Sequence, residues 1–91
     1  MTRKEYIKNR AKNIGKSQKN YENDMKVNYV IFHNPSQTTD TWAEGEDEGL
    51  PVVYGDKAGV ENIISSLNAK NGNEDFSIMT EDEYITNYFA N

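Results

Sequence analysis

The feature that most constrains the fold is the segment of residues 26–33, KVNYVIFH. Val27, Tyr29 and Ile31 alternate with Val30 and Phe32, so an extended chain would carry apolar side chains on both sides. A strand with two apolar faces must be covered twice, and we therefore expect residues 26–33 to form the central strand of a sheet. Only 35% of the 91 residues are hydrophobic, so the core that covers this strand must be small.

The segments that follow predict the remaining elements of the domain. Short strands are indicated at residues 38–42 and 50–54, and a third strand at residues 74–79. Apolar residues at helical spacing predict a helix that Asp56 caps and Gly72 ends. A second helix should begin at a capping box formed by Thr80 and Glu83, with Tyr84, Ile85, Tyr88 and Phe89 packing back on the body.

The predicted fold class is α+β. We expect a small, mainly antiparallel sheet of three to four strands, with helices packed mostly on one face and a basic N-terminal helix in front. The expected core contains Val30, Ile31, Phe32, Val53, Val60, Ile63, Ile64, Leu67, Phe76 and Ile78.

The N-terminal segment is predicted to be separate from this core. Thr2 and Glu5 form a capping box for a helix over residues 2–14, with Ile7, Ala11 and Ile14 as a narrow apolar stripe and Gly15 as the stop. Residues 16–25 have no periodicity and are interpreted as a linker. We therefore divide the chain into a basic helix and linker at 1–25 and a compact acidic domain at 26–91. Removing residues 1–20 should then leave a folded body.

Charge is distributed very unevenly along the chain. Residues 1–26 contain eight of the ten basic residues against three acidic ones, a formal charge of +5. Residues 27–91 contain two basic residues against twelve carboxylates, a formal charge of −10. Such asymmetry bears on partners and solubility rather than on fold.

The acidic body suggests a non-enzymatic module that binds a protein partner. Its carboxylates could imitate a phosphate backbone and occupy the basic groove of a nucleic-acid-binding protein, with fast and salt-sensitive association. The same surface is also compatible with a merely soluble acidic face. The expected partner-binding residues are Trp42, Glu44, Glu46, Asp47 and Glu48.

The basic segment suggests the alternative, a small nucleic-acid-associated regulator that contacts phosphates. No helix-turn-helix or RNA-recognition motif accompanies it. The segment could instead dock on an acidic face of its own body or of a second copy. The candidate phosphate-binding residues are Arg3, Lys4, Lys8, Arg10, Lys12 and Lys16.

Residues suited to catalysis or metal binding are few. The chain has no cysteine, and His33 is its only histidine, which excludes Cys/His catalysis and disfavours structural zinc. No serine lies in a G-x-S-x-G motif, and the glycines around Asp56 fit a turn better than a phosphate loop. We therefore expect no catalytic site, no metal and no cofactor.

The sequence also predicts a cytoplasmic location in a bacterial host cell. No apolar run approaches the roughly 20 residues that span a bilayer, and the charged start MTRKEYIKNR is unlike a signal peptide. We therefore expect no membrane association.

Abundant asparagine and lysine, together with VVYGDKAGVENIISSLNAK and EDFSIMTEDEYI, give the chain a resemblance to small acidic accessory proteins of Gram-positive phages and mobile elements. That resemblance implies an inhibitor of host machinery, such as an anti-CRISPR or other anti-defence protein. It assigns a role to no individual residue.

Overall fold

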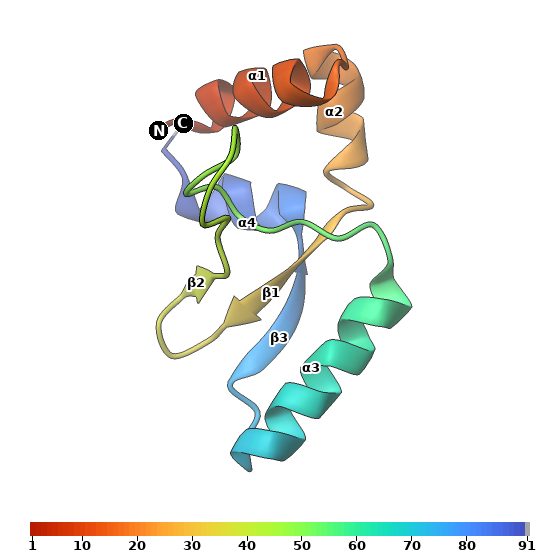
Figure 1. Ribbon diagram of the computed structural model, residues 1–91, viewed down its shortest axis with the longest axis vertical. Helices are drawn as coiled ribbons and strands as arrows, with labels where there is room; N and C mark the ends of the chain where they lie inside the picture. The colour runs from red at the N-terminus through yellow and green to blue at the C-terminus, as the bar shows by residue number, and fades with distance from the viewer. Residues whose placement is uncertain (91) are drawn as a thin grey trace.

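A computed structural model of the chain describes residues 1–90, which form an elongated body of 41 × 24 × 24 Å. Helices α1 and α2 lie at one end, the sheet lies in the middle, and α3 runs along the sheet toward the other end (Figure 1). The elements follow in the order α1 (Arg3–Ile14), α2 (Gln18–Asp24), β1 (Tyr29–His33), β2 (Thr38–Thr39), α3 (Lys57–Asn71), β3 (Phe76–Thr80) and α4 (Glu81–Tyr88).

The sheet has three strands in the order β2-β1-β3, and both pairings are antiparallel. β1 is the central strand, as its two apolar faces predict. It begins at Tyr29 rather than at residue 26, because the chain is still turning after α2, and Val27 is 60% exposed. Its register with β3 runs from Tyr29 opposite Thr80 to His33 opposite Phe76. The α+β class, the small antiparallel sheet and the preceding N-terminal helix are confirmed.

The two faces of β1 belong to two separate hydrophobic clusters. Ile31 packs with Val60 and Ile64 of α3 in the smaller cluster. Val30 and Phe32 point the other way, into the larger cluster, which also contains residues of α1, α2 and α4. α4 therefore packs on one face of the sheet, with α1 and α2 joined to it in the same cluster, and α3 covers the other face.

The N-terminal segment differs from the prediction beyond its first helix. The capping box of Thr2 and Glu5 is present, and Gly15 ends α1 with φ 70°. Residues 16–25, however, are not a linker, because Ser17 caps the seven-residue helix α2. A helix this short shows no apolar periodicity, and tertiary packing, chiefly against α1, stabilises it.

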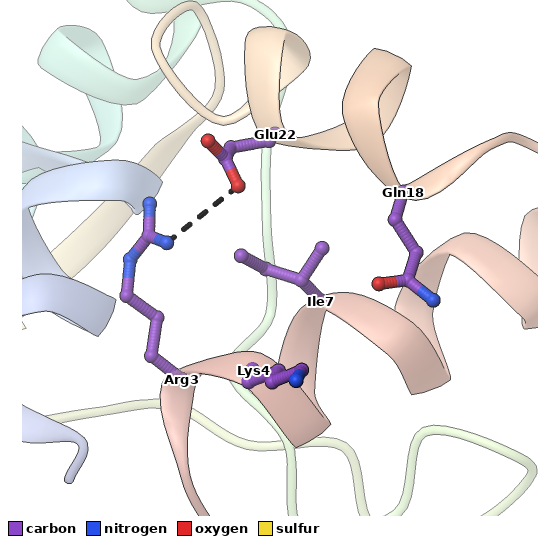
Figure 2. Close-up of a pocket in the computed structure, with 5 residues that line it drawn as sticks. All are labelled: Arg3, Lys4, Ile7, Gln18 and Glu22. Carbon is purple, nitrogen blue, oxygen red and sulfur yellow. Dashed lines mark ion pairs between the residues drawn. The ribbon is translucent and has the colours of Figure 1, made fainter. Parts of the chain in front are cut away.

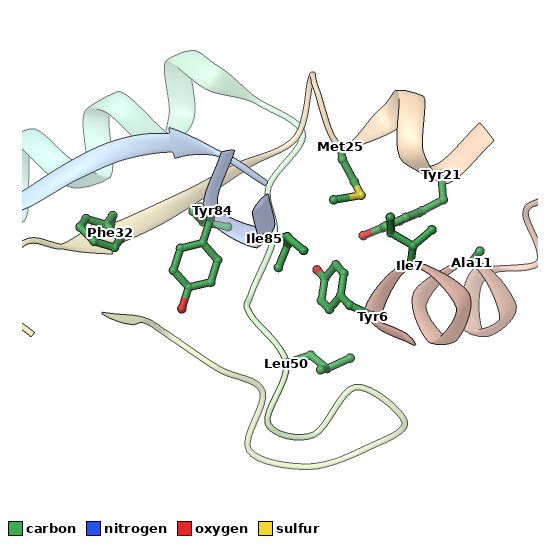
Figure 3. Close-up of a cluster of buried hydrophobic side chains, with 10 residues drawn as sticks. Tyr6, Ile7, Ala11, Tyr21, Met25, Phe32, Leu50, Tyr84 and Ile85 are labelled. Atoms are coloured by element: carbon green, nitrogen blue, oxygen red, sulfur yellow. The ribbon is translucent and has the colours of Figure 1, made fainter. Parts of the chain in front are cut away.

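The larger cluster contains the N-terminal segment, so the expected core was wrong in leaving it out. Tyr6, Ile7 and Ala11 of α1 are at most 4% exposed, and Tyr21 and Met25 are equally buried. Figure 3 shows these side chains meeting Ile85 of α4. Residues 1–25 and 26–90 thus share one hydrophobic cluster.

Several smaller expectations also need correction. Residues 50–54 form only isolated bridges at Pro51 and Tyr54 rather than a strand. Ile14 and Ile63, expected on apolar stripes, are 45% and 40% exposed because each helix is covered along only part of its stripe. The other expected core residues are buried or partly buried: Val30, Ile31, Phe32, Val53, Val60, Ile64, Leu67, Phe76 and Ile78.

Candidate functional site

The acidic loop expected to bind a partner is held in a defined shape by its backbone. The Val52 N–H donates to the Asp40 carbonyl at 2.9 Å, and the Trp42 N–H donates to the Leu50 carbonyl at 3.0 Å. We call residues 40–52 the acidic hairpin. In Figure 1 it is the yellow-green segment that runs from β2 toward α1.

Side chains of α1 anchor the tip of the acidic hairpin through Asp47. Arg10 forms an ion pair with this carboxylate, and the Asn13 side-chain amide donates to its other oxygen at 2.8 Å. Asp47 is therefore engaged inside the molecule and is not one of the free charges that the sequence suggested. It holds the acidic hairpin against α1.

The other expected partner-binding residues are available at the surface. Trp42 is 44% exposed, and Glu44, Glu46 and Glu48 are exposed. Within residues 1–90 none of these three carboxylates forms an ion pair. The acidic hairpin thus presents one large aromatic side chain and three uncompensated negative charges.

Half of the candidate phosphate-binding residues are neutralised within the chain. Arg3 pairs with Asp82 at 2.9 Å and lies 3.7 Å from a carboxylate oxygen of Glu22, and Lys16 pairs with Asp24. Arg10 pairs with Asp47. The basic segment therefore docks on acidic groups of its own chain, one of the alternatives that its charge left open.

A hollow of about 360 Å³ lies between α1 and α2, beside Arg3 (Figure 2). Ile7 forms its apolar floor, and Lys4 and Gln18 stand at its rim. Because Arg3 at this site is already paired with Glu22, the hollow offers only one uncompensated cation.

Three basic residues remain open on α1. Lys4, Lys8 and Lys12 are exposed, follow one another at intervals of four residues, and form no ion pair with any described residue. We call them the lysine stripe. It lies on the same helix as Arg10 and Asn13, so the positive and negative surfaces are neighbours at one end of the molecule.

A buried carboxylate, which sequence reasoning missed, links these helices to the sheet. Glu81 is 0% exposed, and the hydroxyls of Tyr6 and Tyr21 both donate to its Oε2. The Asn28 amide donates to Oε1 at 3.1 Å, and Arg10 Nε donates to the Tyr21 hydroxyl at 3.0 Å. This buried network ties α1, α2 and the start of α4 together, and through Arg10 it reaches the acidic hairpin.

The two tyrosines of the buried network resist ionisation. Burial, together with the hydrogen bond to Glu81, raises the pKa of Tyr21 from 10.0 to about 12. Burial and the charge of Glu81 raise the pKa of Tyr6 further. The folded state therefore retains protons that the unfolded chain loses above pH 10.

Stability should consequently fall as the pH rises above 10. The pKa of each tyrosine is higher in the folded protein than in the unfolded chain, so its full contribution to stability is present below the pKa of the unfolded chain. That contribution is lost as the pH rises through the pKa of the folded protein. For Tyr21 alone the loss at pH 12 should be about 2 kcal/mol. Urea unfolding between pH 8 and 12, with tyrosinate absorbance followed in parallel, measures it. Constant unfolding free energy across pH 10–12 would contradict the role of these tyrosines.

His33 lies at the turn between β1 and β2. Its Nδ1 is 2.6 Å from the Ser36 hydroxyl, which lies 2.6 Å from the Thr38 hydroxyl, and its ring packs on Phe76 at 4.9 Å. Among the described residues, no carboxylate accepts a hydrogen bond from the imidazole. These contacts tie the turn together.

Comparison with known proteins gives no match among family models, curated proteins or solved structures. Within residues 1–90 no group of three or more His, Cys, Asp or Glu side chains is arranged to hold a metal ion. None of the helices formed by these residues combines the length and apolar character needed to cross a membrane. The function must therefore be argued from the surface itself.

Proposed function

We propose that this protein is a non-enzymatic binding module whose acidic hairpin engages a basic, nucleic-acid-binding protein. One observation carries the proposal. Arg10 and Asn13 fix Asp47, and this contact holds Glu44, Glu46 and Glu48 in place beside the half-exposed Trp42.

The fixed geometry of the acidic hairpin suits it to binding. A loop that is already ordered by backbone hydrogen bonds loses little conformational entropy when a partner binds. Partly exposed tryptophans often supply much of the binding energy, while peripheral charges mainly raise the association rate. Trp42 would thus anchor the complex, and the three glutamates would steer it.

Such a module would act as an inhibitor. A surface that occupies a basic groove excludes the nucleic acid that the groove serves, because both compete for the same cations. The resemblance to phage and mobile-element accessory proteins supports an anti-defence role of this kind. We propose a host nucleic-acid-binding effector, in the bacterial cytoplasm, as the class of partner.

The lysine stripe supports the second candidate function, direct nucleic-acid binding. Lys4, Lys8 and Lys12 are exposed and unpaired among the described residues, so they can contact phosphates. Of the six candidate phosphate-binding residues, the self-pairing of Arg3, Arg10 and Lys16 leaves only this short stripe. We therefore place this function second.

Replacing Glu44, Glu46 and Glu48 by glutamine should disrupt partner binding without unfolding the protein. Proteins captured from a low-GC bacterial lysate by the wild type should be lost by this variant. With the captured partner purified, the association rate at low salt should fall about tenfold or more, and its salt dependence should flatten. Trp42→Ala should instead raise the dissociation rate.

The matched control removes three exposed carboxylates elsewhere, by Glu61→Gln, Glu74→Gln and Glu83→Gln. It changes the net charge equally but should keep the partner. If both triple variants bind with the same kinetics at low and high salt, the acidic hairpin is not the binding surface. Loss of binding only when Lys4, Lys8 and Lys12 become glutamine would establish the second candidate function instead.

A further inference from the structure

A hollow of about 390 Å³ separates the acidic hairpin from the end of α4. Leu50 and Glu48 line it from the acidic hairpin, and Tyr88 and Phe89 line it from the C-terminal end of α4. We call it the aromatic hollow. It combines two aromatic rings with one carboxylate.

Packing holds the two rings of the aromatic hollow in place. Tyr88 stacks on Tyr84 at 5.2 Å and contacts Phe32 at 5.3 Å, yet 41% of its surface stays exposed. Phe89 packs edge-on against Tyr6 at 5.3 Å. The rings therefore form a preformed wall rather than one that must order on binding.

The carboxylate at the aromatic hollow is uncompensated. Glu48 also lines an adjoining hollow of about 430 Å³, together with Glu46, Lys12 and Asn13. Neither Glu46 nor Glu48 forms an ion pair with any residue in the range 1–90. An incoming cation would meet Glu48 first, with Glu46 behind it. Two positive charges oppose it: Lys12 and the α-amino group of Met1, a residue that lines both hollows.

We propose that the aromatic hollow accepts an arginine side chain of the basic protein partner, an inference that rests on the proposed function. A guanidinium is planar, stacks on aromatic rings and pairs with a carboxylate through a fork of N–H groups. The ammonium of lysine is a strongly hydrated point charge and makes less use of an aromatic wall. The aromatic hollow should therefore distinguish arginine from lysine, whereas the open charges of the acidic hairpin should not.

Hexaarginine and hexalysine peptides of equal charge test this preference with the full-length protein. At low ionic strength hexaarginine should bind roughly two- to fivefold more tightly, the range expected for one cation–π contact at an exposed site. Amide chemical shifts should move at Glu48 and Tyr88. Lys12→Gln should tighten the binding of both peptides, because it removes one of the two opposing positive charges.

Single substitutions distinguish binding in the aromatic hollow from a general attraction of cationic peptides to carboxylates. Tyr88→Leu keeps apolar packing on Phe32 and should bring hexaarginine down to the affinity of hexalysine, while Glu48→Gln should weaken both peptides. Glu83 is an exposed carboxylate on the same helix. The control substitution Glu83→Gln should change the affinity for either peptide by no more than about twofold. Circular dichroism melts confirm that each variant is folded.

Equal affinity of the two peptides for the wild type, or an arginine preference that survives Tyr88→Leu, would overturn the arginine site. If Glu44→Gln and Glu46→Gln weaken both peptides while Tyr88→Leu and Glu48→Gln weaken neither of them, the arginine site is wrong. In that case the acidic hairpin still stands as the binding surface. Loss of the captured protein partner on changing the acidic hairpin is measured separately, so the two proposals fail independently.

Discussion

Removal of residues 1–20 is expected to abolish cooperative unfolding of the remaining chain. The truncation removes Tyr6, Ile7 and Ala11 from the larger cluster and exposes Ile85 and Met25, both 0% exposed in the whole chain. Each large side chain that returns to water forfeits about 1.5–3 kcal/mol. Together with the lost hydrogen bond to Glu81, the total is of the same order as the 5–15 kcal/mol that holds a typical domain together. Thermal circular dichroism and proton NMR dispersion measure the result.

A charge control shows whether packing is the cause. Lys4→Gln, Lys8→Gln and Lys12→Gln together remove the lysine stripe but no buried side chain, and this variant should melt cooperatively near the wild-type temperature. A truncated chain that still gives a sharp transition within a few degrees of the wild type would show that the chain folds without residues 1–20, as the charge pattern first suggested.

Glu81→Ala should lower the free energy of unfolding by about 3–5 kcal/mol. The substitution leaves the hydroxyls of Tyr6 and Tyr21 and the amide of Asn28 without their shared acceptor. Arg10 donates to the Tyr21 hydroxyl, so the substitution also removes the carboxylate at the end of this chain of hydrogen bonds. Urea unfolding measures the loss, and a decrease below 1 kcal/mol would contradict a structural role for the buried network.

Two further variants test whether the loss of stability comes from the buried position of Glu81 and from the donors left without an acceptor. Glu83→Ala, in the same first turn of α4 but exposed, should cost at most about 1 kcal/mol. Combining Glu81→Leu with Tyr6→Phe and Tyr21→Phe removes the two tyrosine donors along with the acceptor. This triple variant should be more stable than Glu81→Leu alone, because a buried hydroxyl without an acceptor costs more stability than an apolar group in its place.

The buried network also bears on the proposed binding surface. Asp47 of the acidic hairpin is held by Arg10, Arg10 contacts Tyr21, and Tyr21 donates to Glu81. The basic helix α1 is therefore the support on which the acidic hairpin is mounted. The opposite charges of the two segments serve to join them, and three glutamates of the hairpin remain for a partner.

Local signals in the sequence determined where α1 and α3 begin and end and where α4 begins. Thr2 with Glu5 and Gly15 delimit α1, because a capping side chain and a residue with positive φ act within one turn of the backbone. Gly72 ends α3 in the same way, and the Thr80 hydroxyl accepts the Glu83 N–H at the start of α4. Alternation in β1 likewise predicted the central strand and the division of its side chains between two faces.

The position of the N-terminal segment could not be obtained from such signals. Tyr6 and Tyr21 are amphipathic, and neither belongs to the apolar stripe of Ile7 and Ala11, so no periodicity marked them as core residues. α2 is too short to show a period and is stabilised by packing rather than by propensity.

The candidate site likewise combines features that the sequence predicted with features that only the tertiary structure decided. The sequence by itself determined that Trp42 and a group of carboxylates lie together in one loop, because they are neighbours in the chain. Only the tertiary structure decided that Asp47 faces Arg10 while the three glutamates face outward, and that Tyr88 and Phe89 stand across from Glu48. It also decided that Glu81 is buried, since a carboxylate leaves water only where donors from distant segments converge on it, and no local pattern records that convergence.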